Sequence, residues 1–263
     1  MTPSEDAPVG VVEGFFGRPW NWSDRAGYAG FLREIGFDFY IYAPKAEPYL
    51  RRRWRAPLPE PAVDALIRTR EAFRDAGISF GIGLSPFEIH LEPERATAAA
   101  LRAKVAQIDQ IDPDILCILF DDMRGDLPEL ADRQAAVLHL RGVRDRPASL
   151  RRSLAGHAVN PMNQAWLSRI PIMTLTESYA LGARYHPVRS FEAACRRLCG
   201  EALGKRIVDE VTLFRDQGLA GMAEARRRAL IEAYGGFAGS PYAAELRAWL
   251  DGAYAFDPDC LTD

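Results

Sequence analysis

The sequence predicts an α/β fold in which helices connect parallel strands, followed by a helical C-terminal region. Apolar, β-branched and aromatic runs alternate four times with amphipathic segments within about 130 residues. From residue 187 onward, apolar residues recur only at helical spacing. The chain has 263 residues, 48% hydrophobic and 26% charged, which suffices for one folded domain with a small helical appendage.

The expected strands and helices of the first half follow one another directly. Ser23 and Asp24 are good helix caps, and the apolar residues after them keep helical spacing until Gly36. Gly77 ends the next helix, and Ser85 follows the third strand. In chain order, the expected strands cover residues 10–16, 37–43, 78–84 and 115–120, and the expected helices cover residues 23–36, 63–77 and 97–111.

The pattern changes after the fourth strand. Residues 127–153 predict a helix, a basic turn and a helix, and residues 157–160 predict a short strand. Another short apolar run covers residues 170–175. Four helices are expected at residues 191–198, 207–214, 222–234 and 243–254. We therefore divide the chain into a β–α region at 1–178 and a helical region at 179–263.

Composition and charge exclude several classes of protein. There are 33 basic and 36 acidic side chains, so the net charge of −3 gives no general attraction to nucleic acid or an anionic membrane. No apolar run could span a bilayer, and the first nine residues lack the pattern of a secretory signal. The four cysteines form no disulfide framework or zinc motif, and the four histidines are scattered without metal spacing. We expect a cytoplasmic protein without metal or cofactor.

Polar residues at the ends of expected strands are the candidates for chemistry, because ligand sites of parallel α/β folds form there. Glu13 and Gly14 lie on the first strand, Lys45 follows the second, and Asp121 and Asp122 follow the fourth. Two adjacent carboxylates repel each other, which separates their pKa values and suits one ionised and one protonated partner. A helix cap, a solvated turn, or a divalent-metal site shared with Asp126 remains an alternative for the pair.

Four motifs occur in an order that resembles the catalytic domain of glycoside hydrolase family 84, the O-GlcNAcases and related β-N-acetylglucosaminidases. The resemblance covers about residues 9–176. The motifs are Gly-Val-Val-Glu-Gly-Phe-Phe-Gly-Arg-Pro-Trp at 10–20, Tyr-Ala-Pro-Lys at 42–45, Leu-Phe-Asp-Asp at 119–122 and Asn-Pro-Met-Asn at 160–163.

The resemblance implies a TIM-barrel-like fold and substrate-assisted hydrolysis of terminal β-linked GlcNAc on a glycan or glycoprotein. Asp121 would orient the 2-acetamido N–H while the acetamido oxygen attacks the anomeric carbon to form an oxazoline. Asp122 would protonate the leaving oxygen and then take a proton from water. The Gly14 backbone, the Lys45 ammonium and the Asn160 amide would hold sugar hydroxyls.

Each binding candidate also has a plain structural interpretation. Lys45 could be a solvated loop residue, Asn160 before a proline could end a strand, and Gly14 could serve a turn. Glu13 receives no chemical role, because an inward structural carboxylate fits it equally well. Four arginines around Trp54 resemble a nucleic-acid patch, although a solvated loop is favoured in this acidic chain: Arg51, Arg52, Arg53 and Arg55.

The sequence departs from the family pattern between Asp122 and Asn160. Only 37 residues lie between them, where a complete barrel needs three more β–α units of about 30 residues each. The join falls near residues 136–140, and Ala46 and Glu47 stand where an acidic pair commonly follows the lysine. We therefore expect an incomplete or rearranged barrel that self-associates through its open edges. An inactive or weakly sugar-binding descendant of the family is the alternative to an active enzyme.

Overall fold

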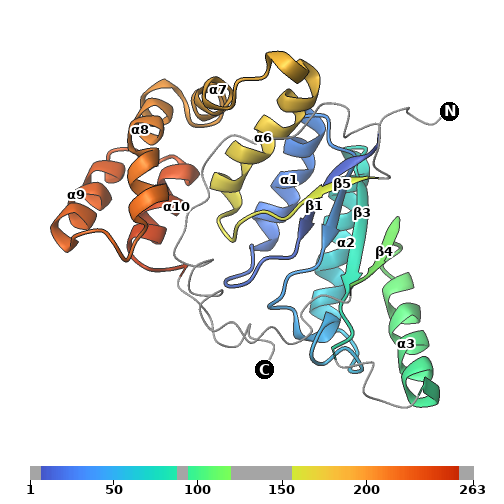
Figure 1. The fold of residues 1–263 in the computed structure, drawn as a ribbon. Helices are drawn as coiled ribbons and strands as arrows, with labels where there is room; N and C mark the ends of the chain where they lie inside the picture. The colour runs from blue at the N-terminus through green and yellow to red at the C-terminus, as the bar shows by residue number, and fades with distance from the viewer. Residues whose placement is uncertain (1–6, 88–93, 120–155, 255–263) are drawn as a thin grey trace. The chain divides into compact units, whose positions relative to one another are not determined.

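The computed structural model describes residues 7–87, 94–119 and 156–254, which form two compact units. The sheet unit comprises the described residues from Pro8 to Leu119 together with residues 156–160. The helical unit comprises residues 161–254 together with Ala7. Figure 1 labels the elements of both units.

The sheet unit contains one sheet of five parallel strands, in the order β4-β3-β2-β1-β5. The last strand therefore pairs with the first, and β4 and β5 stand at the ends of this order. The incomplete α/β barrel predicted from the sequence is confirmed. The strands are β1 (Val9–Glu13), β2 (Phe39–Tyr42), β3 (Ser79–Leu84), β4 (Ile115–Ile118) and β5 (His157–Val159).

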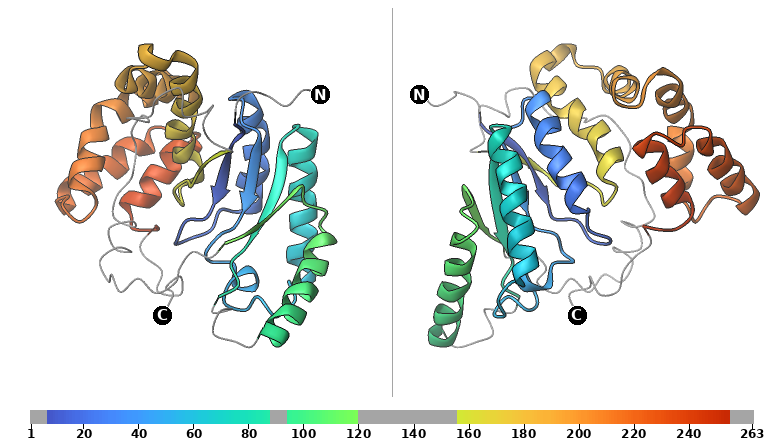
Figure 2. Two further views of the ribbon diagram at one scale, coloured as in Figure 1. Left: turned by 45° about the vertical axis from the view of Figure 1, so that its right-hand side comes forward. Right: turned by 180° about the vertical axis from the view of Figure 1, so that it is seen from behind.

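Three helices of the sheet unit follow β1, β2 and β3 along the chain: α1 (Trp22–Glu34), α2 (Glu60–Asp75) and α3 (Glu94–Asp109). A short 3-10 turn, η1 (Pro48–Leu50), lies in the loop after β2. Helices α1 and α2 lie side by side along the sheet (Figure 2). Tyr40 of β2 stacks on Phe73 of α2 at 4.5 Å between ring centroids, which anchors this helix to the sheet.

The cap of α1 corrects one sequence prediction. The helix begins at Trp22, and its N-cap is Asn21 rather than Ser23 or Asp24. The Asn21 Oδ1 accepts the backbone N–H of Asp24 at 2.8 Å, and its Nδ2 donates to the Asp24 carboxylate at 2.7 Å. Asp24 therefore belongs to the first turn, where its negative charge favours the helix N-terminus.

The helical unit begins with α6 (Ala165–Leu181), which includes the apolar run at residues 170–175. The run is helical despite Pro171 because residues on all sides of it are buried, including Leu167, Ile170, Met173 and Leu175. The elements after it are η3 (Gly182–Arg184), α7 (Pro187–Cys199), α8 (Glu201–Thr212), the π-helical η4 (Leu213–Gln217), α9 (Glu224–Gly235) and α10 (Pro241–Leu250).

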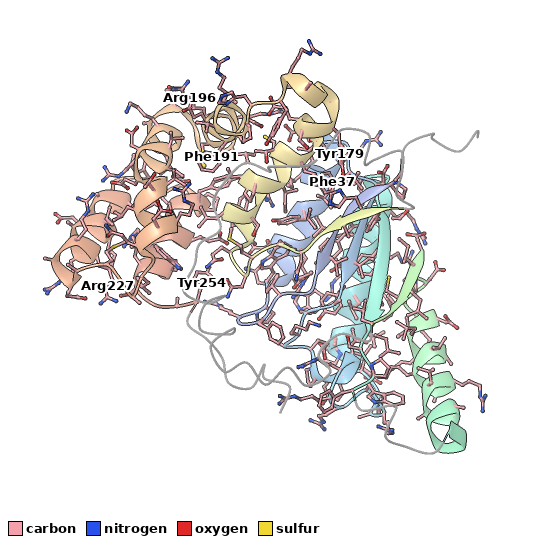
Figure 3. The ribbon with its side chains drawn as sticks, in the orientation of Figure 1. Phe37, Tyr179, Phe191, Arg196, Arg227 and Tyr254 are labelled. Carbon is pink, nitrogen blue, oxygen red and sulfur yellow. The ribbon has the colours of Figure 1, made fainter. Side chains whose placement is uncertain are left out.

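The helical unit has its own aromatic core. Phe214 lies against Trp249 and Tyr234, with ring centroids 5.7 and 6.2 Å apart. Phe191 of α7 is buried, whereas Arg196 on the same helix extends to the surface (Figure 3). The helical periodicity predicted after residue 187 is thus confirmed in residues 187–254, where the structure contains only helices and turns.

The two units divide the chain between Asn160 and Pro161, whereas the sequence pattern predicts that the β–α region ends at residue 178. The difference arises because α6 packs against α7 and α10 within the helical unit. The assignment of 1–178 to a catalytic region stays a prediction about function rather than about packing.

Candidate active site

Three of the predicted site residues leave adjacent strands at one edge of the sheet. Glu13 pairs with Tyr42 in the register of β1 and β2, and Val11 pairs with Val159 in that of β1 and β5. Because all five strands are parallel, their carboxyl ends meet at the same edge. Gly14, Lys45 and Asn160 follow β1, β2 and β5 at this edge.

Gly14 and Asn160 are in direct contact. The Gly14 N–H donates to the Asn160 Oδ1 at 3.1 Å and also to the Val12 carbonyl at 2.9 Å. Gly14 has no positive φ, whereas Gly17 has a φ of 94° and therefore needs the freedom of glycine. A side chain at Gly14 would meet the Asn160 amide at ordinary contact distance. The geometry thus joins two of the predicted sugar-binding groups.

Lys45 is not a solvated loop residue. The residue is only 6% exposed, and its Nζ lies 5.8 Å from the centroid of the Phe16 ring. Phe16 belongs to the loop after β1, so this cation–π contact joins the loops after β1 and β2. A buried ammonium at the edge of the sheet can donate hydrogen bonds to a hydroxyl-rich ligand.

The predicted acid–base pair, Asp121 and Asp122, lies outside the described residues, as does Asp126. The described chain that leads to the pair ends at Leu119, whose N–H donates to the Leu84 carbonyl at 2.9 Å. This bond extends the pairing of β3 with β4 by one residue. The chain therefore leaves β4 at the same carboxyl edge that carries Gly14, Lys45 and Asn160.

Glu13 is an internal structural carboxylate, one of the two interpretations its sequence allowed. It is fully buried and accepts two hydrogen bonds from Arg25, each of 2.8 Å, and a third from the Tyr40 hydroxyl. Burial lowers the pKa of Arg25, but the hydrogen bond and charge of Glu13 outweigh it and raise that pKa above its ordinary value. This cluster fixes α1 to β1 and β2 beneath the site.

Arg25 is further enclosed by two aromatic rings. Its guanidinium lies 4.5 Å from the Trp22 ring and 4.9 Å from the Tyr42 ring. The Tyr42 hydroxyl donates to Glu47 at 3.2 Å, and Glu47 also accepts the backbone N–H of Tyr49 at 3.1 Å. Glu47 therefore orders the loop that follows Lys45, with η1 beginning directly after it.

Sequence reasoning did not find Arg25 or Lys104. Arg25 precedes Tyr28, Ala29 and Leu32 on the buried face of α1, so a charged residue on an apolar face was the available signal. Lys104 is also buried, and its Nζ donates to the Ala56 carbonyl at 2.6 Å. Arg25 therefore fixes α1 to the sheet, and Lys104 fixes the loop before α2.

The cysteines and metal-ligating side chains form no second site among the residues that the structure describes. No three His, Cys, Asp or Glu side chains gather there as metal ligands could. Cys195 is buried on α7, and burial raises the pKa of its thiol well above the ordinary value. Burial also raises the pKa of the Cys199 thiol to about 12, so neither is an activated nucleophile.

A family model described as β-N-acetylglucosaminidase matches residues 9–137 and 129–215, which together span most of the chain. This match, together with the parallel α/β sheet, defines the chain as a glycoside hydrolase. More particularly, it belongs to the β-N-acetylglucosaminidase family, which confirms the resemblance to glycoside hydrolase family 84. The two matched pieces meet at 129–137, beside the join expected at 136–140.

The curated relatives include Protein O-GlcNAcase of Rattus norvegicus and of Mus musculus. Each is 31% identical to this chain over 114 residues, which are 43% of this chain and 12% of the relative. The chain thus matches only a small part of these proteins.

Solved structures share the fold at low sequence identity. A mutant of the O-GlcNAc hydrolase of Thermobaculum terrenum superimposes with a TM-score of 0.71 at 19% identity, covering 95% of this chain and 82% of its own. CpGH84B superimposes with a TM-score of 0.67 at 18% identity, covering 90% of this chain and 59% of its own. Within the described ranges, no helix is long and apolar enough to cross a membrane.

Proposed function

We propose that this chain is a retaining β-N-acetylglucosaminidase that hydrolyses terminal β-linked GlcNAc. The observation that carries the proposal is the family match over residues 9–215, which includes every predicted site residue. The contact between Gly14 and Asn160 supports it, because these residues are 146 positions apart in the chain and the family resemblance implies that both bind the same sugar.

The proposed reaction uses the substrate as nucleophile. Asp121 as a carboxylate accepts the 2-acetamido N–H, and the acetamido oxygen attacks the anomeric carbon to form an oxazoline. Asp122 in its protonated form donates its proton to the departing oxygen, and then as a carboxylate takes a proton from the water that opens the oxazoline. Lys45, the Gly14 backbone and the Asn160 amide hold the sugar hydroxyls.

The first test compares Asp122→Asn with Asp121→Asn on aryl and alkyl β-GlcNAc substrates. We expect Asp122→Asn to lose about 100-fold or more in kcat/KM on alkyl substrates, whose basic leaving oxygen needs a proton, and less on activated aryl ones. Asp121→Asn should impair both classes, because oxazoline formation precedes departure of either leaving group. Equal losses for both variants on every substrate would contradict this division of roles.

A second candidate is a descendant that has lost catalysis and binds sugar weakly. The observation that favours it is the face of β4, where Leu116 and Ile118 are each 38% exposed, although such strands are normally buried on both faces. Turnover of a chromogenic β-GlcNAc substrate that disappears in Asp122→Asn would exclude this candidate. Sugar binding without turnover would establish it.

A further inference from the structure

The loop between β2 and α2, residues 43–59, is strongly basic in a chain that is acidic overall. It carries Lys45 and four arginines against the single acidic residue Glu47, a net charge of +4, whereas the whole chain has −3. Of the charged residues in this loop, the proposed reaction uses only Lys45. Glu47 is already engaged by the Tyr42 hydroxyl and the Tyr49 backbone.

This loop is held in place by its neighbours. Trp54 is fully buried, and its indole N–H donates to the Phe87 carbonyl at 3.3 Å. From α3, the Gln107 side chain accepts the Leu58 N–H at 2.8 Å and donates to the Leu58 carbonyl at 3.0 Å. The ammonium of Lys104 binds the Ala56 carbonyl. The arginines are therefore presented from a fixed backbone, which lowers the entropy cost of binding a ligand.

Of the four arginines in this loop, one is buried and three are exposed to solvent. Arg51 is buried, with its guanidinium 5.9 Å from both the Phe16 and the Phe87 rings. Arg52, Arg53 and Arg55, here called the Arg rim, are exposed. The Arg53 guanidinium lies 5.0 Å from the Tyr49 ring, and that of Arg55 lies 4.2 Å from the Trp54 ring.

The Arg rim belongs to the same edge as the proposed sugar site. Lys45 and Arg51 both lie against Phe16, at 5.8 and 5.9 Å from its ring centroid. Phe16 follows Gly14 by two residues. The loop that carries the rim thus leaves β2 at the carboxyl edge and returns past the first strand's loop.

We infer that the Arg rim binds an acidic peptide segment next to the GlcNAc-bearing residue, so the substrate is a protein-linked GlcNAc in an acidic context. This inference rests on the proposed function. Guanidinium groups pair with carboxylates through two parallel hydrogen bonds, which favours an anionic partner. Single-stranded nucleic acid fits less well, because the ring of Trp54 is buried and the Arg53 guanidinium lies over the ring of Tyr49, which limits base stacking on this loop.

The test uses two fluorescent GlcNAc-serine peptides that differ only in three flanking Glu or Gln residues. We expect kcat/KM to be about fivefold higher for the acidic peptide at low salt, and the ratio to approach one at 0.5 M salt. In Arg52→Gln/Arg53→Gln the ratio should fall to near one. The matched control, Arg33→Gln/Arg68→Gln, removes the same charge from exposed positions on α1 and α2 and should keep the wild-type ratio.

Anisotropy of the same peptides separates this inference from the proposed function. Equal turnover of both peptides by the wild type would contradict the binding of an acidic segment by the Arg rim. It would still support the proposed hydrolysis of β-linked GlcNAc. If neither peptide is turned over, tighter binding of the acidic peptide that is lost in Arg52→Gln/Arg53→Gln still supports the rim and counts against hydrolysis. Tighter binding of a single-stranded oligonucleotide or of a sulfated GlcNAc oligosaccharide than of the acidic peptide overturns the choice of a peptide.

Discussion

At the scale of single residues, the base of the site is stabilised by a buried charge pair rather than by apolar packing alone. Arg25 and Glu13 are 3% and 0% exposed, and their two hydrogen bonds are supplemented by the Tyr40 hydroxyl. Removing one member of such a pair leaves an uncompensated buried charge, which costs more than the pair contributes as a whole.

Glu13→Gln should lower the free energy of unfolding by about 3–5 kcal/mol, because Arg25 would keep its charge without a carboxylate. Urea unfolding measures this loss. In the background of Arg25→Met, the same Glu13→Gln change should cost clearly less, because the charge to be compensated is gone. Additive losses in the double variant would show that the two side chains act independently.

The burial of Tyr42 predicts that the folded state loses stability at alkaline pH. Burial raises its pKa well above the ordinary value of 10.0, and the Glu47 charge adds to this although Arg25 opposes it. Since the folded state holds the proton more tightly, this contribution to stability is complete below about pH 10 and is lost as the pH rises toward the folded pKa.

The measurement is the free energy of unfolding at pH 8.5 and pH 10.5. Tyr42→Phe should lose less stability between these two pH values than the wild type does. Tyr49→Phe, which removes a hydroxyl from a half-buried ring, is the control. A wild-type stability that does not decrease between the two pH values would refute the assignment.

At the scale of elements, the start of α6 depends on a residue far along the chain. The side chain of its N-cap residue, Gln164, makes no capping hydrogen bond to the first turn. The carboxylate of Glu245 on α10 instead accepts the backbone N–H groups of Trp166 and Leu167 at 2.9–3.0 Å. A negative charge at this position satisfies orphan donors and favours the helix dipole.

Glu245→Gln should therefore lower the free energy of unfolding of the helical unit by about 1–2 kcal/mol, because the charge-assisted bonds become neutral ones. Thermal unfolding followed by circular dichroism measures it. Glu232→Gln, an exposed change on α9, is the matched control and should have little effect. A loss of the same size in the control would contradict the claim that Glu245 stabilises the start of α6.

At the scale of the whole molecule, β4 and β5 stand at the ends of the sheet where a complete barrel would continue. Ile82 and Leu84 of β3 are fully buried, whereas their partners on β4, Leu116 and Ile118, are exposed. Exposed strand edges and apolar patches favour association.

We expect self-association that weakens in Leu116→Lys/Ile118→Lys, together with lower β-GlcNAc turnover than a complete barrel would give. Light scattering and specific activity at several protein concentrations measure both. Val188→Lys, which changes another exposed apolar residue, is the control. A monomer whose specific activity is high and independent of protein concentration would show that the further strands of a complete barrel are dispensable.

The sequence by itself determined the β–α alternation, the helical C-terminal region and the family, because these depend on local periodicity and on motifs contiguous in the chain. The motifs also identify Gly14 and Asn160 as candidate binding residues, although no local pattern shows that the two are in contact. The predicted caps of α1 were wrong by two or three residues, because Asn, Ser and Asp can all cap a helix and the sequence offered all three within four positions.

Only the tertiary structure decided which groups meet. The pairing of Glu13 with Arg25, the burial of Lys45 against Phe16 and the capping of α6 by Glu245 join residues that no local pattern connects. The order of the strands likewise placed β5 beside β1 and left β4 at the end of the sheet. These contacts form because the folded chain buries polar groups where a partner from a distant segment can pair with them. Packing between distant segments decides which groups are paired in this way, and the propensities of neighbouring residues do not.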